Sequence, residues 1–431
     1  MVFSKSALGT RQARSAKALD AILESGDLLL VFAGESIGKP GGHDQTYPFL
    51  PHPDYYWLSG LRRASGVMAY SKTEGWKPFV KLVNLEERLW EGTRETAEGE
   101  SIDTLAEWIK KQKARRIFAL GQASAKNTPD GALSSLNDAS LKVQEALNRA
   151  RRIKDSEEIA LVERCASAAA KGYLRLEEVL KDGISERHLQ LEYEHAVLKA
   201  GADSFPYDTL VGSGLNSAVL HATPTTKLLR TGELVLVDAG ADIQEYCVDI
   251  SRTYAVGGTK SSRQKDLYDL VLKSQLSAIE VCKPGVEWHD VHRKAAHVLT
   301  AGLKDLGLLR GEVDSLLESG AISMFFPHGV GHMVGLRVRD VGSRLGTTAR
   351  NCCGVRVRVD MPLEEGFLMT VEPGLYFVAP LLDDPKKREL YRDQIDWNKV
   401  ESWRDFGGIR IEDNILVTAS GPRSLTSAIP K

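Results

Sequence analysis

The sequence lacks a strong excess of either charge. Its 56 lysine and arginine residues oppose 58 aspartate and glutamate residues, which gives a formal net charge of −2. Proteins that bind nucleic acid or an acidic membrane surface usually carry a basic excess that attracts phosphate groups. We therefore expect neither nucleic acid nor a membrane among the partners of this protein.

Long hydrophobic runs are also missing. No stretch approaches the roughly 20 consecutive apolar residues that span a bilayer. Residues 1–23 contain no apolar core of the length found in signal peptides. The two absences together predict a soluble, cytoplasmic protein.

Cysteine is scarce, with 5 residues and no CxxC spacing. An odd number without that spacing is not typical of a disulfide framework. Two of the five are neighbours in the chain, which makes them poor disulfide partners for each other. We expect reduced and mostly packing residues at Cys165, Cys247, Cys282, Cys352 and Cys353.

The pattern of apolar residues predicts more than one domain. Strands are expected at 28–32, 66–70, 78–83 and 116–120, with helices at 10–25 and 103–113. This alternation is typical of an α/β domain. The basic stretch ARRIKD then precedes Ser156, a helix start, so we place an N-terminal α/β domain at 1–155 and a second domain at 156–431. Further helices are expected at 185–201, 263–282 and 288–307.

The most informative stretch runs from Leu234 to Tyr254 and reads as two strands joined by a turn. Each strand carries one aspartate, Asp238 or Asp249. An aspartate buried at the end of an apolar run is costly unless it is paired or bound to a cation, which suggests a site for a hard metal ion. The alternative is a solvated hairpin whose aspartates cap turns.

Three later segments carry further polar residues in apolar surroundings. His328 and His332 have the spacing of zinc-protease histidines, but the glycines between them make a helix unfavourable. Glu372 ends one apolar strand and Glu412 lies in another. A single glutamate in a strand usually faces solvent, and two such residues beside glycine-rich turns are less usual.

Asp238, Asp249, Glu372 and Glu412, with His332 as a nitrogen donor, form a candidate metal site. Two unit charges about 4 Å apart repel by roughly 4 kcal/mol at an effective dielectric constant of about 20, so four carboxylates need cations. Two divalent ions would balance them, with Mn²⁺ as the first expectation and Co²⁺ or Zn²⁺ as alternatives. Such a pair lowers the pKa of a water molecule from about 16 toward roughly 7, which predicts metal-assisted hydrolysis.

The ordered motifs, namely the two spaced aspartates, HGVGH, EPGLY and GGIRIEDN, resemble those of the pita-bread metallopeptidases. The closest likeness is to the branch of prolidase and aminopeptidase P, which cleave the bond before proline. The N-terminal segment YPFLPHPDYYWLSG resembles the non-catalytic domain of that branch. The resemblance implies a small α/β N-terminal domain followed by a C-terminal pita-bread domain with an α+β, creatinase/aminopeptidase-like fold.

The resemblance also implies roles for individual residues. The metal ligands would be Asp238, Asp249, His332, Glu372 and Glu412, with Asp249 bidentate, Glu412 bridging both ions and Glu372 also shuttling a proton. His221 would stabilise the oxyanion and His328 would hold the substrate near the metals. Positions that orient the ligands or contact the substrate are matched by Tyr207, Thr370 and Arg410.

One motif departs from the family pattern. Where the family reads VHD, this chain reads VRD, so Arg339 replaces a histidine that contacts substrate. An arginine stays protonated and cannot exchange a proton with a reacting group near neutral pH. It can still bind a substrate carbonyl or carboxylate, so Arg339 is a candidate substrate-binding residue.

The choice between dipeptides and longer peptides rests on another arginine. Arg358 lies upstream of Glu372 at the spacing of the carboxylate-binding arginine of prolidases, with Arg356 as a rival. The long segment between Tyr376 and Gly407 also resembles bacterial dipeptidases. We therefore expect an Xaa-Pro dipeptidase that binds small peptides, and a homodimer as in relatives. The alternatives are an aminopeptidase P, a methionine aminopeptidase or a catalytically inactive peptide-binding relative.

Overall fold

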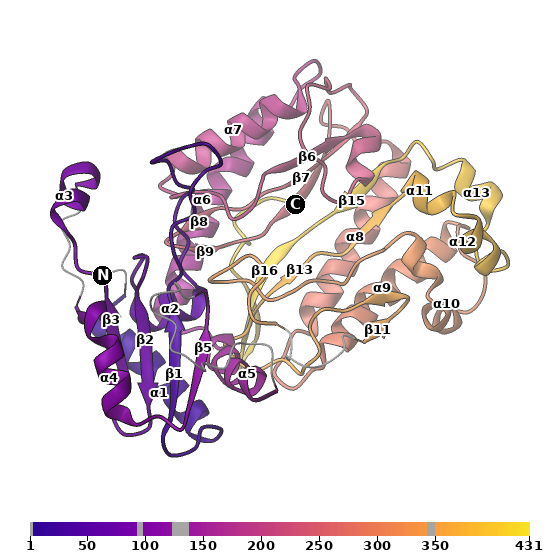
Figure 1. Cartoon of the computed structure of the whole chain (residues 1–431). Helices are drawn as coiled ribbons and strands as arrows, with labels where there is room; N and C mark the ends of the chain where they lie inside the picture. The colour runs from indigo at the N-terminus through magenta and orange to yellow at the C-terminus, as the bar shows by residue number, and fades with distance from the viewer. Residues whose placement is uncertain (1–2, 93–97, 123–137, 343–349) are drawn as a thin grey trace. The chain divides into compact units, whose positions relative to one another are not determined.

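The computed structural model describes residues 3–92, 98–122, 138–342 and 350–431 (Figure 1). The chain forms two compact units, Met1–Arg151 and Arg152–Lys431. None of the helices in these described ranges is both long and apolar enough to cross a membrane.

The N-terminal unit is built on a five-stranded sheet with the strand order β4-β3-β2-β1-β5. Its strands are β1 (Asp27–Phe32), β2 (Val67–Ser71), β3 (Gly75–Val80), β4 (Glu100–Ser101) and β5 (Arg116–Leu120). Every residue of β1 is buried, because this strand pairs antiparallel with β2 and parallel with β5 and is covered on both faces. The apolar sequence DLLLVF therefore suits a central strand.

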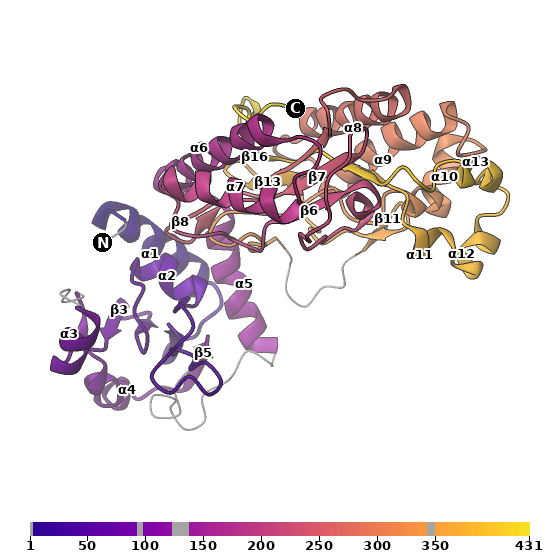
Figure 2. The same cartoon turned by 90° about the horizontal axis from the view of Figure 1, so that it is seen from above.

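Five helices accompany this sheet, with a short 3₁₀ turn at Ile102–Thr104. They are α1 (Lys5–Asp20), α2 (Pro53–Ser59), α3 (Leu85–Glu91), α4 (Leu105–Gln112) and α5 (Asp138–Arg152). Trp108 of α4 packs with Leu28 and Leu30 of β1 on one face, and α1 and α2 lie over the other face (Figure 2). The first helix begins earlier than the sequence predicted, because the side chain of Ser4 caps it by accepting from the amide of Ala7.

The C-terminal unit contains two three-stranded sheets, β10-β7-β6 and β13-β16-β17, with three further strand pairs. The first sheet and its neighbours are β6 (Leu210–Ser213), β7 (Leu234–Asp238), β8 (Asp242–Ile243), β9 (Tyr246–Cys247) and β10 (Ser251–Ala255). The later strands are β11 (Asn351–Cys352), β12 (Val355–Arg356), β13 (Leu368–Val371), β14 (Gly374–Tyr376), β15 (Gly408–Arg410), β16 (Asp413–Thr418) and β17 (Gly421–Ser424).

Two helix pairs pack on these sheets, α6 with α7 and α8 with α9 (Figure 2). The helices are α6 (Ser156–Val179), α7 (Glu186–Lys199), α8 (Ser262–Glu280), α9 (Trp288–Asp305), α10 (Val313–Ser319), α11 (Ala379–Leu382), α12 (Pro385–Leu390) and α13 (Trp397–Glu401). Short 3₁₀ turns lie at Gly214–Ala218 and Ala321–Met324. One continuous apolar core joins α8 and α9 to β13 and β16. This packing holds in place the two strands that adjoin Glu372 and Glu412.

Strand pairing brings the acidic residues to neighbouring strand ends. In the stretch from Leu234 to Tyr254, β7 and β10 pair antiparallel with Ser251 opposite Asp238. Asp249 lies just before β10 rather than inside it, because the small β8-β9 hairpin takes up part of the connection. Glu372 directly follows β13, and Glu412 directly precedes β16, whose Asp413 pairs with Val371.

Candidate metal centre

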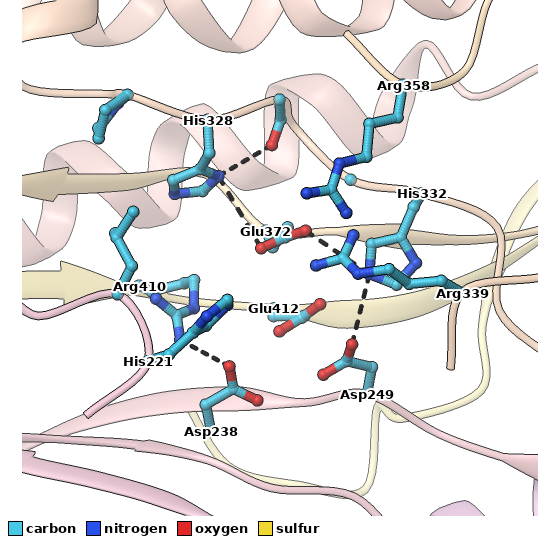
Figure 3. Close-up of a pocket in the computed structure, with 14 residues that line it drawn as sticks. His221, Asp238, Asp249, His328, His332, Arg339, Arg358, Glu372, Arg410 and Glu412 are labelled. Carbon is cyan, nitrogen blue, oxygen red and sulfur yellow. Dashed lines mark hydrogen bonds and ion pairs between the residues drawn. The ribbon is translucent and has the colours of Figure 1, made fainter. Parts of the chain in front are cut away.

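The five predicted metal ligands line a single cavity of about 260 Å³ (Figure 3). They are Asp238, Asp249, His332, Glu372 and Glu412. Residues predicted to act on the substrate line the same cavity, namely His221, His328, Arg339, Arg358 and Arg410. The amide of Glu412 donates to the carbonyl of Ser251 over 3.1 Å, so the edge of β10 also positions this glutamate.

Tyr207 lies between the two aspartates. Its hydroxyl oxygen is 2.7 Å from Oδ1 of Asp238 and 2.6 Å from Oδ1 of Asp249. A hydroxyl carries one proton and can donate it to only one carboxylate at a time. Burial, followed by the charges of both aspartates, raises the pKa of Tyr207 well above its usual value. Tyr207 therefore stays protonated and holds the two carboxylates side by side.

His332 presents a lone pair to the acidic residues. Its Nδ1 lies 2.9 Å from the carbonyl oxygen of Met333, to which it must donate. The other nitrogen, Nε2, is then unprotonated in the neutral ring and faces Oδ2 of Asp249 at 3.4 Å and Oε1 of Glu372 at 3.8 Å. Nitrogen and oxygen acceptors that face one another repel unless a cation lies between them. A metal-binding histidine usually donates its other ring N–H to a backbone carbonyl, as Nδ1 of His332 does here.

Glu412 has one carboxylate oxygen without a partner. Its Oε2 accepts from the hydroxyl of Ser251 over 2.8 Å, whereas Oε1 is buried and has no hydrogen-bond partner among the described residues. Burial first, and then the charge of Asp249, raises the pKa of Glu412 well above its usual value. An unsatisfied buried oxygen is costly, so this site fits a divalent cation.

Asp249, His332 and Glu412 form the tightest part of the centre, with one ligand atom of each within 4.8 Å of the others. Burial favours a raised pKa for Asp249, but a proton on Nε2 of His332, in place of a cation, gives a hydrogen bond and a positive charge that lower it on balance. Burial raises the pKa of Glu372, and the positive charges of protonated His332 and of Arg410 only partly oppose this effect. The oxygen-rich set with one imidazole suits Mn²⁺, Co²⁺ or Zn²⁺.

Arg410 joins the metal centre to its surroundings. Its Nη2 donates to Oδ2 of Asp238 over 2.6 Å, its Nε to the hydroxyl of Ser251 over 2.8 Å and its Nη1 to the hydroxyl of Tyr376 over 3.0 Å. Burial nevertheless raises the pKa of Asp238 to about 7, against the opposing charge of Arg410. In the absence of a cation, a proton therefore competes for Asp238 near neutral pH.

The two histidines on the substrate side are neutral. Burial first, and then the charge of Arg410, lowers the pKa of His328 to about 3. Its Nδ1 donates to the carbonyl of Gly329 over 2.9 Å, and its Nε2 accepts from the hydroxyl of Tyr376 over 2.9 Å. Partial burial and nearby arginines, Arg410 first, also lower the pKa of His221. A neutral ring can donate one hydrogen bond and accept another without adding charge to the cavity.

Arg339 and Arg358 both extend into the cavity (Figure 3), whereas Arg356, the rival to Arg358, is not among its lining residues. Burial first, and then the charge of Arg339, lowers the pKa of Arg358. Asp340, next to Arg339, pairs with Lys154 at 2.8 Å, and both side chains are 1% exposed. A buried ion pair thus fixes the backbone that presents Arg339.

Sequence reasoning missed four residues that support the site. Ser251 and Tyr376 contact Arg410 directly, and the side-chain oxygen of Asn414 accepts from the amide of Asp249 over 3.1 Å. Lys154 has no signal in the sequence beyond its place in the basic stretch ARRIKD. The available signals were local: Tyr376 lies in EPGLY, Asn414 in IEDN, and Ser251 two residues after Asp249.

Comparison with known proteins gives the family. The sequence model of metallopeptidase family M24 matches residues 160–419 of this chain. The model of the aminopeptidase P N-terminal domain matches residues 10–111. The chain belongs to metallopeptidase family M24. Members of this family use a dinuclear centre of divalent metal ions, which agrees with the acidic cavity described above. This M24 metallopeptidase is an enzyme.

Curated relatives of this M24 metallopeptidase are named probable Xaa-Pro aminopeptidases. The Neosartorya fischeri protein is 30% identical over 410 residues, which cover 90% of this chain and 87% of the relative. The Aspergillus niger protein is 31% identical over 415 residues, which cover 90% of this chain and 87% of the relative.

Solved structures of aminopeptidase P resemble the whole M24 metallopeptidase. Aminopeptidase P from E. coli, solved with the inhibitor Pro-Leu, has a TM-score of 0.80 and 25% identity over 100% of this chain and 96% of its own. The Pseudomonas aeruginosa aminopeptidase has a TM-score of 0.79 and 28% identity over 98% of this chain and 95% of its own. The predicted fold, a small α/β domain followed by a pita-bread domain, is confirmed.

Proposed function

We propose that this M24 metallopeptidase is an Xaa-Pro aminopeptidase, which removes the first residue from peptides whose second residue is proline. The observation that carries the proposal is the likeness to aminopeptidase P over nearly the whole chain, including the N-terminal domain. The comparisons favour this alternative over the dipeptidase that the sequence predicted. The dipeptidase prediction rested partly on the segment between Tyr376 and Gly407. This local resemblance to dipeptidases is weaker evidence for the substrate than the resemblance to aminopeptidase P over nearly the whole chain.

The ligands for two divalent ions would be Asp238, Asp249, His332, Glu372 and Glu412. When bound, such ions polarise the scissile carbonyl and make a water molecule nucleophilic at neutral pH. Mn²⁺ remains the first expectation for the native ion. The cytoplasmic location and the homodimer likewise remain predictions.

Glu372 is the residue that we propose for proton transfer. Its carboxylate lies beside the metal ligand His332, and burial raises its pKa toward the range in which it can both accept and return a proton. His221 would donate to the oxygen that becomes negative as the carbonyl is attacked, a contribution of about 3 kcal/mol in comparable sites. Its lowered pKa keeps it neutral, so that it brings one N–H and no fixed charge.

The remaining residues would position the peptide. His328 is held by Tyr376 and Gly329 at the cavity wall, where it can orient the residue after the cleaved bond. Arg339 and Arg358 extend into the cavity and can bind carbonyl oxygens or a C-terminal carboxylate of the substrate. Tyr207 and Arg410 both donate hydrogen bonds to Asp238. We therefore propose that they affect the substrate mainly by orienting that carboxylate.

The deciding experiment compares Ala-Pro with Ala-Pro-Ala and a longer Ala-Pro peptide on the metal-loaded enzyme. We expect kcat/KM for the tripeptide to exceed that for the dipeptide by about tenfold or more, equivalent to about 1.4 kcal/mol. Ala-Ala-Ala serves as the control and should not be cleaved at a comparable rate. Faster cleavage of Ala-Pro than of Ala-Pro-Ala would instead support the Xaa-Pro dipeptidase.

A further inference from the structure

A second group of metal-type side chains lies apart from the carboxylates. It consists of Cys352, Cys353 and His292, none of which lines the acidic cavity. One ligand atom of each lies within 4.8 Å of the others. Cys352 belongs to β11, which packs beside α9, the helix that carries His292 (Figure 1). This group is referred to below as the thiol pair and its histidine.

The spacing of the thiol pair suits a cation. The two sulfur atoms are 3.7 Å apart. Two thiolates that each lie about 2.3 Å from a tetrahedral ion are separated by about 3.8 Å. Cys353 and Gly354, with φ values of 52° and 82°, form the two-residue turn between β11 and β12. This turn places two successive side chains so that their sulfur atoms meet on one side of the hairpin.

His292 provides the independent observation. Its side chain is fully buried, and its Nδ1 accepts from the amide of Val330 over 3.1 Å. The neutral ring therefore carries its proton on Nε2, which makes no hydrogen bond of ordinary geometry among the described residues, although the backbone of Cys352 lies close to the ring. A buried donor with only a poorly aligned acceptor is costly, and a thiolate beside it would provide a better one.

We propose that Cys352 and Cys353 bind one soft divalent cation, such as Zn²⁺ or Cd²⁺, with His292 donating from Nε2 to a sulfur atom. The two ligands are thiolates, so the site selects a different class of ion from the oxygen-rich centre. Cys352 is only half-buried, which gives the ion access from solvent. This assignment does not depend on the peptidase activity.

The test adds Cd²⁺ to the full-length enzyme already loaded with Mn²⁺ and follows the ultraviolet thiolate-to-cadmium absorption. We expect a band that saturates at one equivalent and is reduced by competing Zn²⁺. Cys352→Ser and Cys353→Ser should each weaken Cd²⁺ binding by about tenfold or more. Cys282→Ser, which removes a fully buried cysteine elsewhere, should leave the band unchanged. Asp249→Ala should also leave it unchanged, because it alters only the carboxylate centre.

A second measurement guards against variants that misfold. In the wild-type protein, Cd²⁺ should protect two thiols from alkylation, and mass spectrometry should locate the protection at Cys352 and Cys353. Absence of a band in the wild type, or a band that persists when both cysteines are serine, would overturn the assignment. Unchanged Cd²⁺ affinity in His292→Phe would show that His292 does not donate a hydrogen bond to the bound thiolates.

Discussion

Arg410 donates to Asp238 over 2.6 Å, and both side chains are buried in the wall of the metal centre. The same guanidinium reaches Ser251 and Tyr376, so one residue orients a proposed metal ligand and the group that holds His328. We expect Arg410→Ala to lower the free energy of unfolding of the metal-free protein by about 3 to 5 kcal/mol, because it removes the positively charged partner of the buried Asp238 carboxylate. Urea unfolding in the presence of a chelator measures this loss. A change below about 0.5 kcal/mol, the range of ordinary surface substitutions, would contradict the structural role.

Loss of a proposed metal ligand should abolish activity without unfolding the protein. We expect Asp249→Ala and Glu372→Ala to abolish peptide hydrolysis while circular dichroism stays close to that of the wild type. Metal analysis should show reduced metal content for Asp249→Ala, since Asp249 lies in the tightest part of the centre. The matched control is Glu365→Ala, which removes an exposed acid before β13. Near-wild-type turnover by either ligand variant with metal present would refute the site.

The raised pKa values predict how metal removal depends on pH. Burial raises the pKa of Asp238 from 3.8 to about 7 and also raises those of Glu372 and Glu412. Between about pH 4 and pH 7 the metal-free folded protein thus holds protons that the unfolded chain has released. Unfolding then releases protons, so the free energy of unfolding falls as pH rises through this window, by a few kcal/mol.

Thermal unfolding with a chelator at pH 5.5 and pH 8, repeated with added Mn²⁺, tests this prediction. The metal-free protein should melt at a lower temperature at pH 8, and Mn²⁺ should raise the melting temperature more at pH 8 than at pH 5.5, since ligands must be deprotonated. Asp238→Asn should flatten the pH dependence of the metal-free protein. A metal-free protein that is more stable at pH 8 would show that these carboxyl groups are not protonated in the fold.

Arg339 should affect substrate use and not metal content. It extends into the cavity beside Arg358 but is not among the ligand set. We expect Arg339→His to change kcat/KM for Ala-Pro-Ala by about tenfold in either direction, because it replaces a fixed charge by a ring that can exchange a proton. Arg356→His, which changes an arginine of β12 outside the cavity lining, is the control. Equal kinetics for wild type and Arg339→His across several peptides would make Arg339 a bystander.

The pair formed by Lys154 and Asp340 should stabilise the fold and the position of Arg339. Both side chains are 1% exposed, so removing one partner leaves a buried charge. We expect Asp340→Asn to lower the free energy of unfolding by about 3 kcal/mol or more and to raise KM more than it lowers kcat. Denaturant unfolding and steady-state kinetics measure the two effects. Lys304→Ala, which removes an exposed ion pair with Glu312, should change stability by less than about 1 kcal/mol.

Several elements could be predicted from sequence because local chemistry defines them. The helix expected after ARRIKD begins at Ser156 behind the cap formed by Asp155, and α8 and α9 lie close to the helices expected at 263–282 and 288–307. Seven helices of the described residues were not predicted, namely α2, α3, α5, α10, α11, α12 and α13. The short α2 is almost entirely buried, so its residues show no alternation of apolar and polar faces. In α5 the buried residues Val143, Ala146, Leu147 and Ala150 do have helical spacing, so this helix could have been predicted from its apolar pattern.

The sequence alone determined the chemistry of this protein: which acids stand in apolar surroundings, which histidines accompany them, and where VRD departs from VHD. Only the tertiary structure decided the distances. The pairing of β7 with β10 and of β13 with β16 sets Asp238, Asp249, Glu372 and Glu412 around one cavity. The tertiary structure also brings Ser251 into contact with Glu412 and Tyr376 into contact with His328. It places Cys352 and Cys353 beside His292. Contacts between residues so far apart in the chain depend on strand register and helix packing, which no short motif encodes.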